Sequence, residues 1–456
     1  MNRFVHQSSP PFHQLAAWLL SALLGPALTA EQWPQFRGPG ASGVDSTRPA
    51  LVHWNVPEGE GVLWKTPIPG LSHASPVIWD NRIYVLTAVT ESAAALKVGL
   101  YGDIGSLNER DPHQWRVVAL DRDDGRIVWD TQLHEGVPRS RRHPKASPAN
   151  STPATDGTHI VVLAGSEGLN CLGRDGSRIW QRDLGPMDAG YFRDPGAQWG
   201  FASSPIIHGD RVLVQCDVQT NAFLAAYEIA TGRELWRTPR QDVPTWSTPT
   251  VIEAGGRTQV AVNGWRETAG YDLQTGRRLW HLNGGGDIPV PTPILAGDLM
   301  IFTSAHGALR PMRAIRPEAS GDITPAEPGQ TNAAIAWVHP RQGNYMQTPI
   351  AVGDWLWGCA DTGVLTCFNL RTGEIQYSER LLSGPGYTAS PVSDGRNLYF
   401  TSETGDVIVV AVRPEFSVLS RNLLGETCLA TPALLDGVLY FRTRNHLMAI
   451  GKRGGS

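Results

Sequence analysis

A set of aromatic and hydrogen-bonding residues stands just ahead of repeated Ser-Pro and Thr-Pro dipeptides. Its members are His73, Asn150, Trp199, Trp246, Tyr345, Gln347 and Tyr387. If each dipeptide opens an equivalent strand around one axis, these side chains meet at the mouth of a channel, where ligands usually converge. Such a group could hold a planar or sugar-like ligand. The alternative is that the same side chains close the funnel and pack its loops.

No pattern typical of catalysis accompanies this set. The sequence has neither a Gly-x-Ser-x-Gly elbow nor a glycine-rich phosphate loop. Its 13 histidines are scattered, and a metal site needs more ligands than the pair His134 and His143 supplies. Four acids between the repeats could pair as acid and base, although solvated loops explain them as well: Asp188, Asp194, Asp242 and Asp287. We therefore assign no catalytic residue and no metal ligand.

The dipeptide marks a long-period repeat that would position these residues. It occurs at Ser75-Pro76, Thr152-Pro153, Ser204-Pro205, Thr248-Pro249, Thr292-Pro293, Thr348-Pro349, Ser390-Pro391 and Thr431-Pro432. A recurrence of roughly 40–50 residues is typical of propellers and related arrays. Proline is tolerated at the start of an innermost strand, because an edge strand can lack one N–H group.

Each repeat continues with turn residues, a β-rich run, a small residue and then a large aromatic residue. In full repeats the end reads Asp-x-x-x-Gly-x-x-x-Trp, as from Asp121 to Trp129. We expect the aromatic residue to fill the wedge between neighbouring blades, beside the small residue that makes room for it. The predicted packing residues are Trp64, Trp129, Trp180, Trp236, Trp280, Trp337 and Tyr377.

The pattern predicts an all-β fold, an eight-bladed β-propeller of four-stranded antiparallel blades. The last repeat ends after Ile450 without a fourth strand, and residues 61–67 match the missing piece. An N-terminal strand should thus complete the last blade and remove the open edge. The predicted organisation is a signal peptide at 1–30, a leader at 31–54, the propeller at 55–451 and a tail at 452–456.

The predicted signal peptide places the protein in the periplasm or outside the cell. Arg3 precedes an apolar run from Leu15 to Leu28, which ends near a cleavage site at Ala30. We expect no transmembrane segment after its removal, and a monomer. A formal net charge of −4 gives no reason to expect nucleic-acid binding. The basic run from Arg139 to Lys145 is interpreted as a solvated loop.

The sequence leaves open whether two of the cysteines form a disulfide, and it contains two insertions. Of the five cysteines, Cys359 and Cys367 could pair across a hairpin as a disulfide or remain free, because the strand register decides this. The insertions at 88–114 and 317–333 are expected to be loops on the ring surface, where partners often bind.

The repeat resembles the PQQ-like β-propeller repeat, which quinoprotein dehydrogenases share with the BamB lipoprotein of outer-membrane β-barrel assembly. The resemblance rests on segments such as Ala119 to Trp129 and covers about residues 55–451. BamB proteins carry a lipobox cysteine after the signal peptide, whereas Glu31 follows Ala30 here. Quinoprotein alcohol dehydrogenases hold pyrroloquinoline quinone (PQQ) against two adjacent cysteines, and no two cysteines are adjacent in this chain.

The resemblance implies a BamB-like, non-catalytic scaffold that binds a protein in the cell envelope, with outer-membrane protein assembly as a candidate process. A scaffold of this kind is expected to need no cofactor. One alternative is a PQQ-dependent oxidoreductase of the alcohol or sugar dehydrogenase type, with PQQ and Ca²⁺ at Trp199 or Trp246. Another is a carbohydrate-binding propeller that uses the same aromatic funnel.

Overall fold

A computed structural model describes residue 1 and residues 32–92, 95–99, 105–307 and 309–452. Residues Glu31–Ser456 form one compact unit. The predicted signal peptide lies outside the described residues except for Met1. Among the helices that the structure describes, none is long and apolar enough to cross a membrane.

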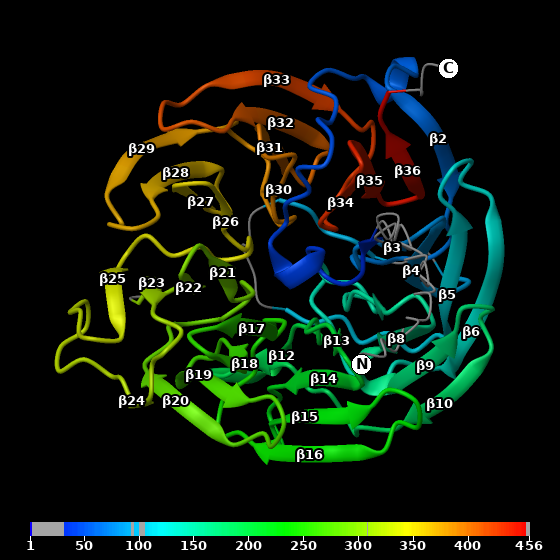
Figure 1. Ribbon diagram of the computed structural model, residues 1–456. Helices are drawn as coiled ribbons and strands as arrows, with labels where there is room; N and C mark the ends of the chain where they lie inside the picture. Colours follow the sequence, from blue (N-terminus) through cyan, green and yellow to red (C-terminus); the bar gives the residue numbers. More distant parts are fainter. Residues whose placement is uncertain (2–31, 93–94, 100–104, 308, 453–456) are drawn as a thin grey trace. The chain divides into compact units, whose positions relative to one another are not determined.

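The described residues form eight blades, each a small and mainly antiparallel sheet, that follow one another around a common centre (Figure 1), together with one separate two-stranded hairpin. Blade 1 contains β3 (Val77–Trp79), β4 (Arg82–Val89), β5 (His113–Asp121) and β6 (Ile127–Gly136), and blade 2 contains β7 (Ala154–Thr155), β8 (His159–Leu163), β9 (Leu169–Gly173) and β10 (Arg178–Arg182). Blade 3 contains β13 (Ile206–His208), β14 (Arg211–Cys216), β15 (Phe223–Glu228) and β16 (Glu234–Pro239). Blade 4 contains β17 (Thr250–Ala254), β18 (Arg257–Val262), β19 (Glu267–Asp272) and β20 (Arg278–Asn283). The eight-bladed propeller predicted from the repeat is confirmed.

The remaining blades have the same order from the centre outward. Blade 5 contains β21 (Ile294–Ala296), β22 (Leu299–Thr303), β23 (Met312–Ile315) and β25 (Ile335–His339), and blade 6 contains β26 (Ile350–Val352), β27 (Trp355–Cys359), β28 (Val364–Asn369) and β29 (Ile375–Arg380). Blade 7 contains β30 (Val392–Ser393), β31 (Asn397–Thr401), β32 (Asp406–Ala411) and β33 (Val418–Leu423). Blade 8 contains β34 (Ala433–Leu435), β35 (Val438–Arg442), β36 (His446–Ile450) and β2 (Val62–Pro67). Three short 3₁₀ turns are η1 (Pro39–Ala41), η2 (Val56–Glu58) and η3 (Gly165–Glu167).

The predicted closure is also confirmed. The N-terminal strand β2 pairs antiparallel with β36, the last strand of the chain, and places Trp64 opposite Ala449. Figure 1 shows blue β2 beside red β36. The last blade is therefore built from both ends of the described chain, and the ring has no free seam between its first and last blades.

Neighbouring blades are joined by the tryptophans of the outer strands. Trp129 lies opposite the small residue Ala119 in its own sheet, and its indole N–H donates to the carbonyl of Arg174 in the next blade. Trp64 likewise donates to the carbonyl of Arg122. Its ring covers Gly125, whose φ is +72°, and a Cβ added there would lie 2.4 Å from that ring. The glycine of the turn is required both by its backbone conformation and by this close approach.

The Ser or Thr before each proline joins the inner strands. Its backbone N–H donates to the hydroxyl of the corresponding residue in the next blade, as Ser75 N–H does to Thr152 Oγ1 at 3.0 Å. Six such bonds are present, in two runs: Ser75 to Thr152 to Ser204 to Thr248, and Thr292 to Thr348 to Ser390 to Thr431. We call this arrangement the hydroxyl ladder. It explains why the repeated dipeptide begins with a hydroxyl residue as well as ending in proline.

The leader packs across the inner ends of the blades. Its strand β1 (Gln32–Trp33) adds to the inner edge of blade 1 by pairing with β3. Arg37 is completely buried and donates to the carbonyls of Pro349 and Pro391, which belong to two other blades. Figure 1 shows this dark blue segment, with its 3₁₀ turn η1, near the centre of the ring.

The insertion at 317–333 lies mostly on the surface, as expected, but part of it joins blade 4. Its strand β24 (Gly321–Asp322) pairs in parallel with β20 and extends the outer edge of blade 4. Ala319 and Ile323 are 4% and 5% exposed, because their apolar side chains pack with a core cluster that includes Trp280. These two residues of the insertion therefore belong to the core.

Replacing the tryptophan of the closing strand should weaken the whole ring. Trp64→Ala removes the indole from the wedge between blades 8 and 1, and we expect a loss of about 3–5 kcal/mol in the free energy of unfolding. Urea denaturation measures this loss. The control is Ile179→Ala on the outer strand of blade 2, where the side chain is 45% exposed and a change within about 0.5 kcal/mol is expected. Equal stability of the two variants would contradict the proposed role of Trp64.

Candidate functional site

A cavity of about 160 Å³ lies in the central channel. Five of the seven predicted residues line it, namely His73, Asn150, Trp199, Trp246 and Tyr345. The leader contributes Phe36, and the hydroxyl ladder contributes residues such as Thr248 and Thr292. The residue positions before the inner strands therefore do converge on one space, while a ligand for that space stays a prediction.

The other two predicted residues do not line the cavity. Gln347 is fully buried and donates from Nε2 to the carbonyl of Ala389. Tyr387 is also fully buried, and its ring lies against Gly363, where an added Cβ would come within 2.7 Å of Cε2. Both side chains are therefore packed in the protein interior and do not face the mouth of the channel.

An aromatic wall is built by an insertion before blade 3. The hairpin of β11 (Gly190–Tyr191) and β12 (Asp194–Gln198) stacks Tyr191 on Trp199, with ring centroids 5.2 Å apart and an interplanar angle of 9°. Trp199 in turn lies 5.5 Å from Trp246. This arrangement gives the cavity a continuous wall of aromatic side chains.

The polar predicted residues are largely used by the fold itself. Asn150 accepts hydrogen bonds from Ser147 and donates to the carbonyl of Phe201. His73 Nε2 lies 3.0 Å from the carbonyl of Lys145, so Nε2 must carry a proton and donate. Burial lowers the pKa of His73 to about 4, and the imidazole is therefore neutral near pH 7.

The interpretation of the basic run as a solvated loop is wrong for three of its residues. Arg142, His143 and Lys145 are between 2% and 5% exposed. Lys145 Nζ lies 2.6 Å from Glu403 Oε1 in blade 7, and Arg142 lies 2.6 Å from Glu109. Because each cation is paired with a carboxylate, the basic run adds no unbalanced charge to the channel wall.

The same two cations hold the insertion of blade 1 near the channel. Lys145 Nζ donates to the carbonyl of Gly99, and the Gly99 N–H donates to Glu403 Oε2. Arg142 donates to the carbonyl of Ala95. The described part of this insertion between β4 and β5 is a loop, as predicted from the sequence, and its contacts with Arg142 and Lys145 hold it to the ring.

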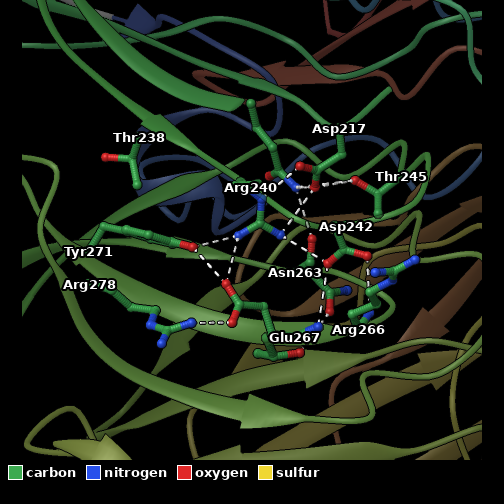
Figure 2. Close-up of polar contacts among 12 residues, drawn as sticks. Asp217, Thr238, Arg240, Asp242, Thr245, Asn263, Arg266, Glu267, Tyr271 and Arg278 are labelled. Carbon is green, nitrogen blue, oxygen red and sulfur yellow. Dashed lines mark hydrogen bonds and ion pairs between the residues drawn. The ribbon is translucent and has the colours of Figure 1, made fainter. Parts of the chain in front are cut away.

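A second buried network, which the sequence did not predict, supports Trp246 (Figure 2). Arg240 has a fully buried side chain that contacts Asp217 at 2.6 Å and Asp242 at 3.2 Å. Thr245 Oγ1 donates to Asp217 Oδ2, which fixes the residue next to Trp246. The Trp246 indole N–H then donates to the carbonyl of Gly200. The network therefore positions one aromatic face of the cavity.

Asp242 is the carboxylate of this network whose pKa is raised. It shares the Arg240 guanidinium with Asp217 (Figure 2). Burial raises the pKa of Asp242 to about 6, although the attraction of Arg240 opposes the shift. The sequence places Asp242 among four loop acids, and in the folded chain its side chain is buried beside Arg240.

All five cysteines are free and buried. Cys359 lies opposite Leu365, and Cys367 lies opposite Trp357, so the strand register does not place the two thiols across from each other. Burial raises the pKa of Cys171 and Cys367 to about 12, which disfavours a nucleophilic thiolate. Within the described ranges, no three His, Cys, Asp or Glu side chains gather as a possible metal site.

The fold and the channel define a propeller of the PQQ-like class. The chain belongs to the family described as outer membrane protein assembly factor BamB, whose model matches residues 36–184 and 169–415. No curated protein matches the chain.

Solved structures of the same fold include BamB and dehydrogenases. BamB from Moraxella catarrhalis is 16% identical, with 80% of this chain and 100% of that chain covered and a TM-score of 0.53. A europium-containing methanol dehydrogenase is 12% identical, with coverages of 91% and 90% and a TM-score of 0.61. Quinohemoprotein alcohol dehydrogenase from Comamonas testosteroni is 12% identical, with coverages of 93% and 82% and a TM-score of 0.57. At these identities the likeness shows the fold alone.

Neutralising Asp242 should change how stability depends on pH. Because the folded state raises the pKa of Asp242 above its unfolded value, the folded state binds the proton more tightly, and stability falls as pH rises from about 4 to about 6. Asp242→Asn should remove this fall, by an amount on the order of 2 kcal/mol. Urea unfolding at a series of pH values measures it, with Asp298→Asn at an exposed turn as the control. A wild-type pH profile in the Asp242 variant would contradict the assignment.

Proposed function

We propose that this protein is an exported, non-catalytic scaffold that binds another protein in the cell envelope. The observation that carries the proposal is the apolar character of the outer blade edges. Seven exposed aliphatic side chains lie on the outermost strands of four blades: Ile127 and Val128 on β6, Ile179 on β10, Ile375 on β29, and Val418, Leu419 and Leu423 on β33.

An exposed apolar edge strand is a template for strand addition. Its outer N–H and C=O groups have no partner in the sheet, and soluble proteins usually protect such edges with charges or prolines. A partner can add an extended segment through main-chain hydrogen bonds, while its side chains contact the aliphatic residues. The edges of blades 1, 2, 6 and 7 each present at least one exposed aliphatic side chain beside polar or charged residues, and the leader already contacts residues 420–423 at the edge of blade 7.

The chain itself supports this mode of binding. Strand β24 adds in parallel to the outer edge of blade 4, and Asn55 forms a parallel bridge with Leu423 at the edge of blade 7. Outer blade edges in this protein therefore accept added segments. Membership of the BamB family supports an envelope protein as the partner, with outer-membrane protein assembly as the process.

Photo-cross-linking at the edge of blade 7 tests this proposal. A photoreactive residue at Leu419 should give protein adducts in intact envelopes, while one at Glu234 on the outer strand of blade 3 should give few, because the described residues of that strand include no exposed large aliphatic side chain. Val418→Lys combined with Leu419→Lys should abolish adducts formed from position 423. Glu234→Lys, which also changes the charge by two, is the matched control. Equal adducts from positions 419 and 234, or adducts from position 423 that survive both lysines, would contradict edge docking.

A quinone cofactor is not part of the proposal, because the donor set does not fit it. The carboxylate beside the channel, Glu403, is engaged by Lys145, Thr388 and Gly99. Ca²⁺ requires six to eight oxygen ligands, and the described residues offer no acidic cluster at the cavity. The cavity of about 160 Å³ is also below the roughly 300 Å³ at which sites for larger organic ligands begin.

Calorimetric titration of PQQ, with and without Ca²⁺, tests this part of the proposal. We expect no heat of binding at micromolar protein, because the cavity lacks both the volume and the ligands. Trp199→Ala serves as a reference for heat that arises elsewhere on the protein. Micromolar binding that disappears in Trp199→Ala would favour the oxidoreductase over the scaffold.

A further inference from the structure

The channel cavity contains a break in the hydroxyl ladder. The ladder runs from Ser75 to Thr248 and resumes at Thr292, and among the described contacts no bond joins Thr248 to Thr292. Thr292 is 2% exposed and is among the residues that line the cavity, while its Oγ1 is itself fully buried and has no hydrogen-bond partner. A buried hydroxyl left without a partner costs about 1–3 kcal/mol, so a group that bonded to it would be stabilised.

The shape and size of the cavity favour a single flat ring. Trp199, Trp246 and Tyr345 line it together with aliphatic residues such as Ile288 and Leu429. Its volume of about 160 Å³ is close to that of apolar cavities of about 150 Å³ that bind benzene. Aromatic walls of this kind accept a further ring in stacked or edge-to-face contact.

The charges around the cavity favour an uncharged occupant. Lys145 is paired with Glu403, Arg142 with Glu109, and burial keeps His73 neutral by lowering its pKa to about 4. The guanidinium of Arg37, next to the lining residue Phe36, is already bonded to four backbone carbonyls. A charged ligand would therefore lose its hydration without gaining a free opposite charge. A sugar would bring several hydroxyl groups, whereas the Asn150 amide and the Trp246 indole N–H are already bonded to the protein.

We propose that the channel cavity is a binding site for an uncharged phenol-type ring, with the ring between the aromatic walls and its hydroxyl bonded to Thr292. Once the Thr292 side chain turns about χ1 to present its Oγ1 to the cavity, a phenol hydroxyl can donate to it and accept from a neighbouring ladder hydroxyl, such as that of Thr348, which already accepts the Thr292 N–H. The ligand is either a free phenol or a tyrosine side chain of an inserted peptide. This site is separate from the outer edges of the blades, so the proposal does not depend on edge docking.

A comparison of two nearly isosteric ligands tests the site. Calorimetry with 4-methylphenol and p-xylene should show binding of both to the wild-type protein, with 4-methylphenol the tighter ligand. Thr292→Val should weaken 4-methylphenol about fivefold, the equivalent of one net hydrogen bond, and leave p-xylene unchanged. The fold should survive this substitution, because the Thr292 hydroxyl has no partner and its backbone N–H still donates to Thr348.

Three further measurements define the outcome. Ala202→Leu, which places a larger side chain at a residue that lines the cavity, should abolish binding of both rings while the circular dichroism spectrum remains that of the wild type. 4-Methylbenzoate and glucose should not bind. Absence of 4-methylphenol binding, equal weakening of both rings by Thr292→Val, or tighter binding of glucose would overturn the proposal.

A blocked tripeptide, N-acetyl-Gly-Tyr-Gly-amide, identifies the source of the ring. Binding of this peptide that is weakened by Thr292→Val would support the site with a tyrosine side chain as the ligand. If only free 4-methylphenol binds, the site is likewise supported, with a small phenol as the ligand. In either case the result is independent of the cross-linking at Leu419, and the two proposals can fail separately.

Discussion

The contact between an outer-strand tryptophan and the glycine turn of the next blade is the interaction on which the ring depends. Twisted sheets that radiate from one axis leave a wedge between neighbours, and a large planar side chain fills it. The indole N–H of Trp337, for example, donates to the carbonyl of Leu370 in the next blade, while its ring covers Gly373. The same contact at Trp64 joins the last blade to the first, so one local motif determines both blade spacing and ring closure.

A rigid ring allows distant segments to support one another at its centre. Arg37 of the leader bonds to the inner strands of two blades, and Lys145 between blades 1 and 2 pairs with Glu403 of blade 7. Arg240 and its acidic partners keep Trp246 at the channel wall. Each buried cation is stable only because an opposite charge or several carbonyl groups meet it, and a fixed arrangement of blades guarantees those partners.

The fold could be predicted because its determinants are local and repeated. Ser-Pro or Thr-Pro, the small residue and the turn before tryptophan recur within each blade, and the match of residues 61–67 to other outer strands predicted the pairing of β2 with β36. The site was predictable only in part. Five predicted residues reach the cavity, because a residue just before an inner strand lies at the mouth of the channel: His73, Asn150, Trp199, Trp246 and Tyr345. The burial of Lys145 was missed, because its partner Glu403 is far away in the sequence and has no pattern that identifies it.

The two interruptions of the hydroxyl ladder have a mechanical consequence. One lies between blades 4 and 5, and the other lies between blades 8 and 1, where Ser75 Oγ also lacks a partner. The inner rim therefore consists of two arcs of four blades, each held by three hydrogen bonds. At the first interruption the blades are still joined, because Thr250 Oγ1 donates to the carbonyl of Pro293 and Ser247 Oγ donates to the carbonyl of Pro291. At the second interruption the Trp64 indole connects the last blade to the first. Load between the two arcs therefore passes through these contacts and not through the ladder.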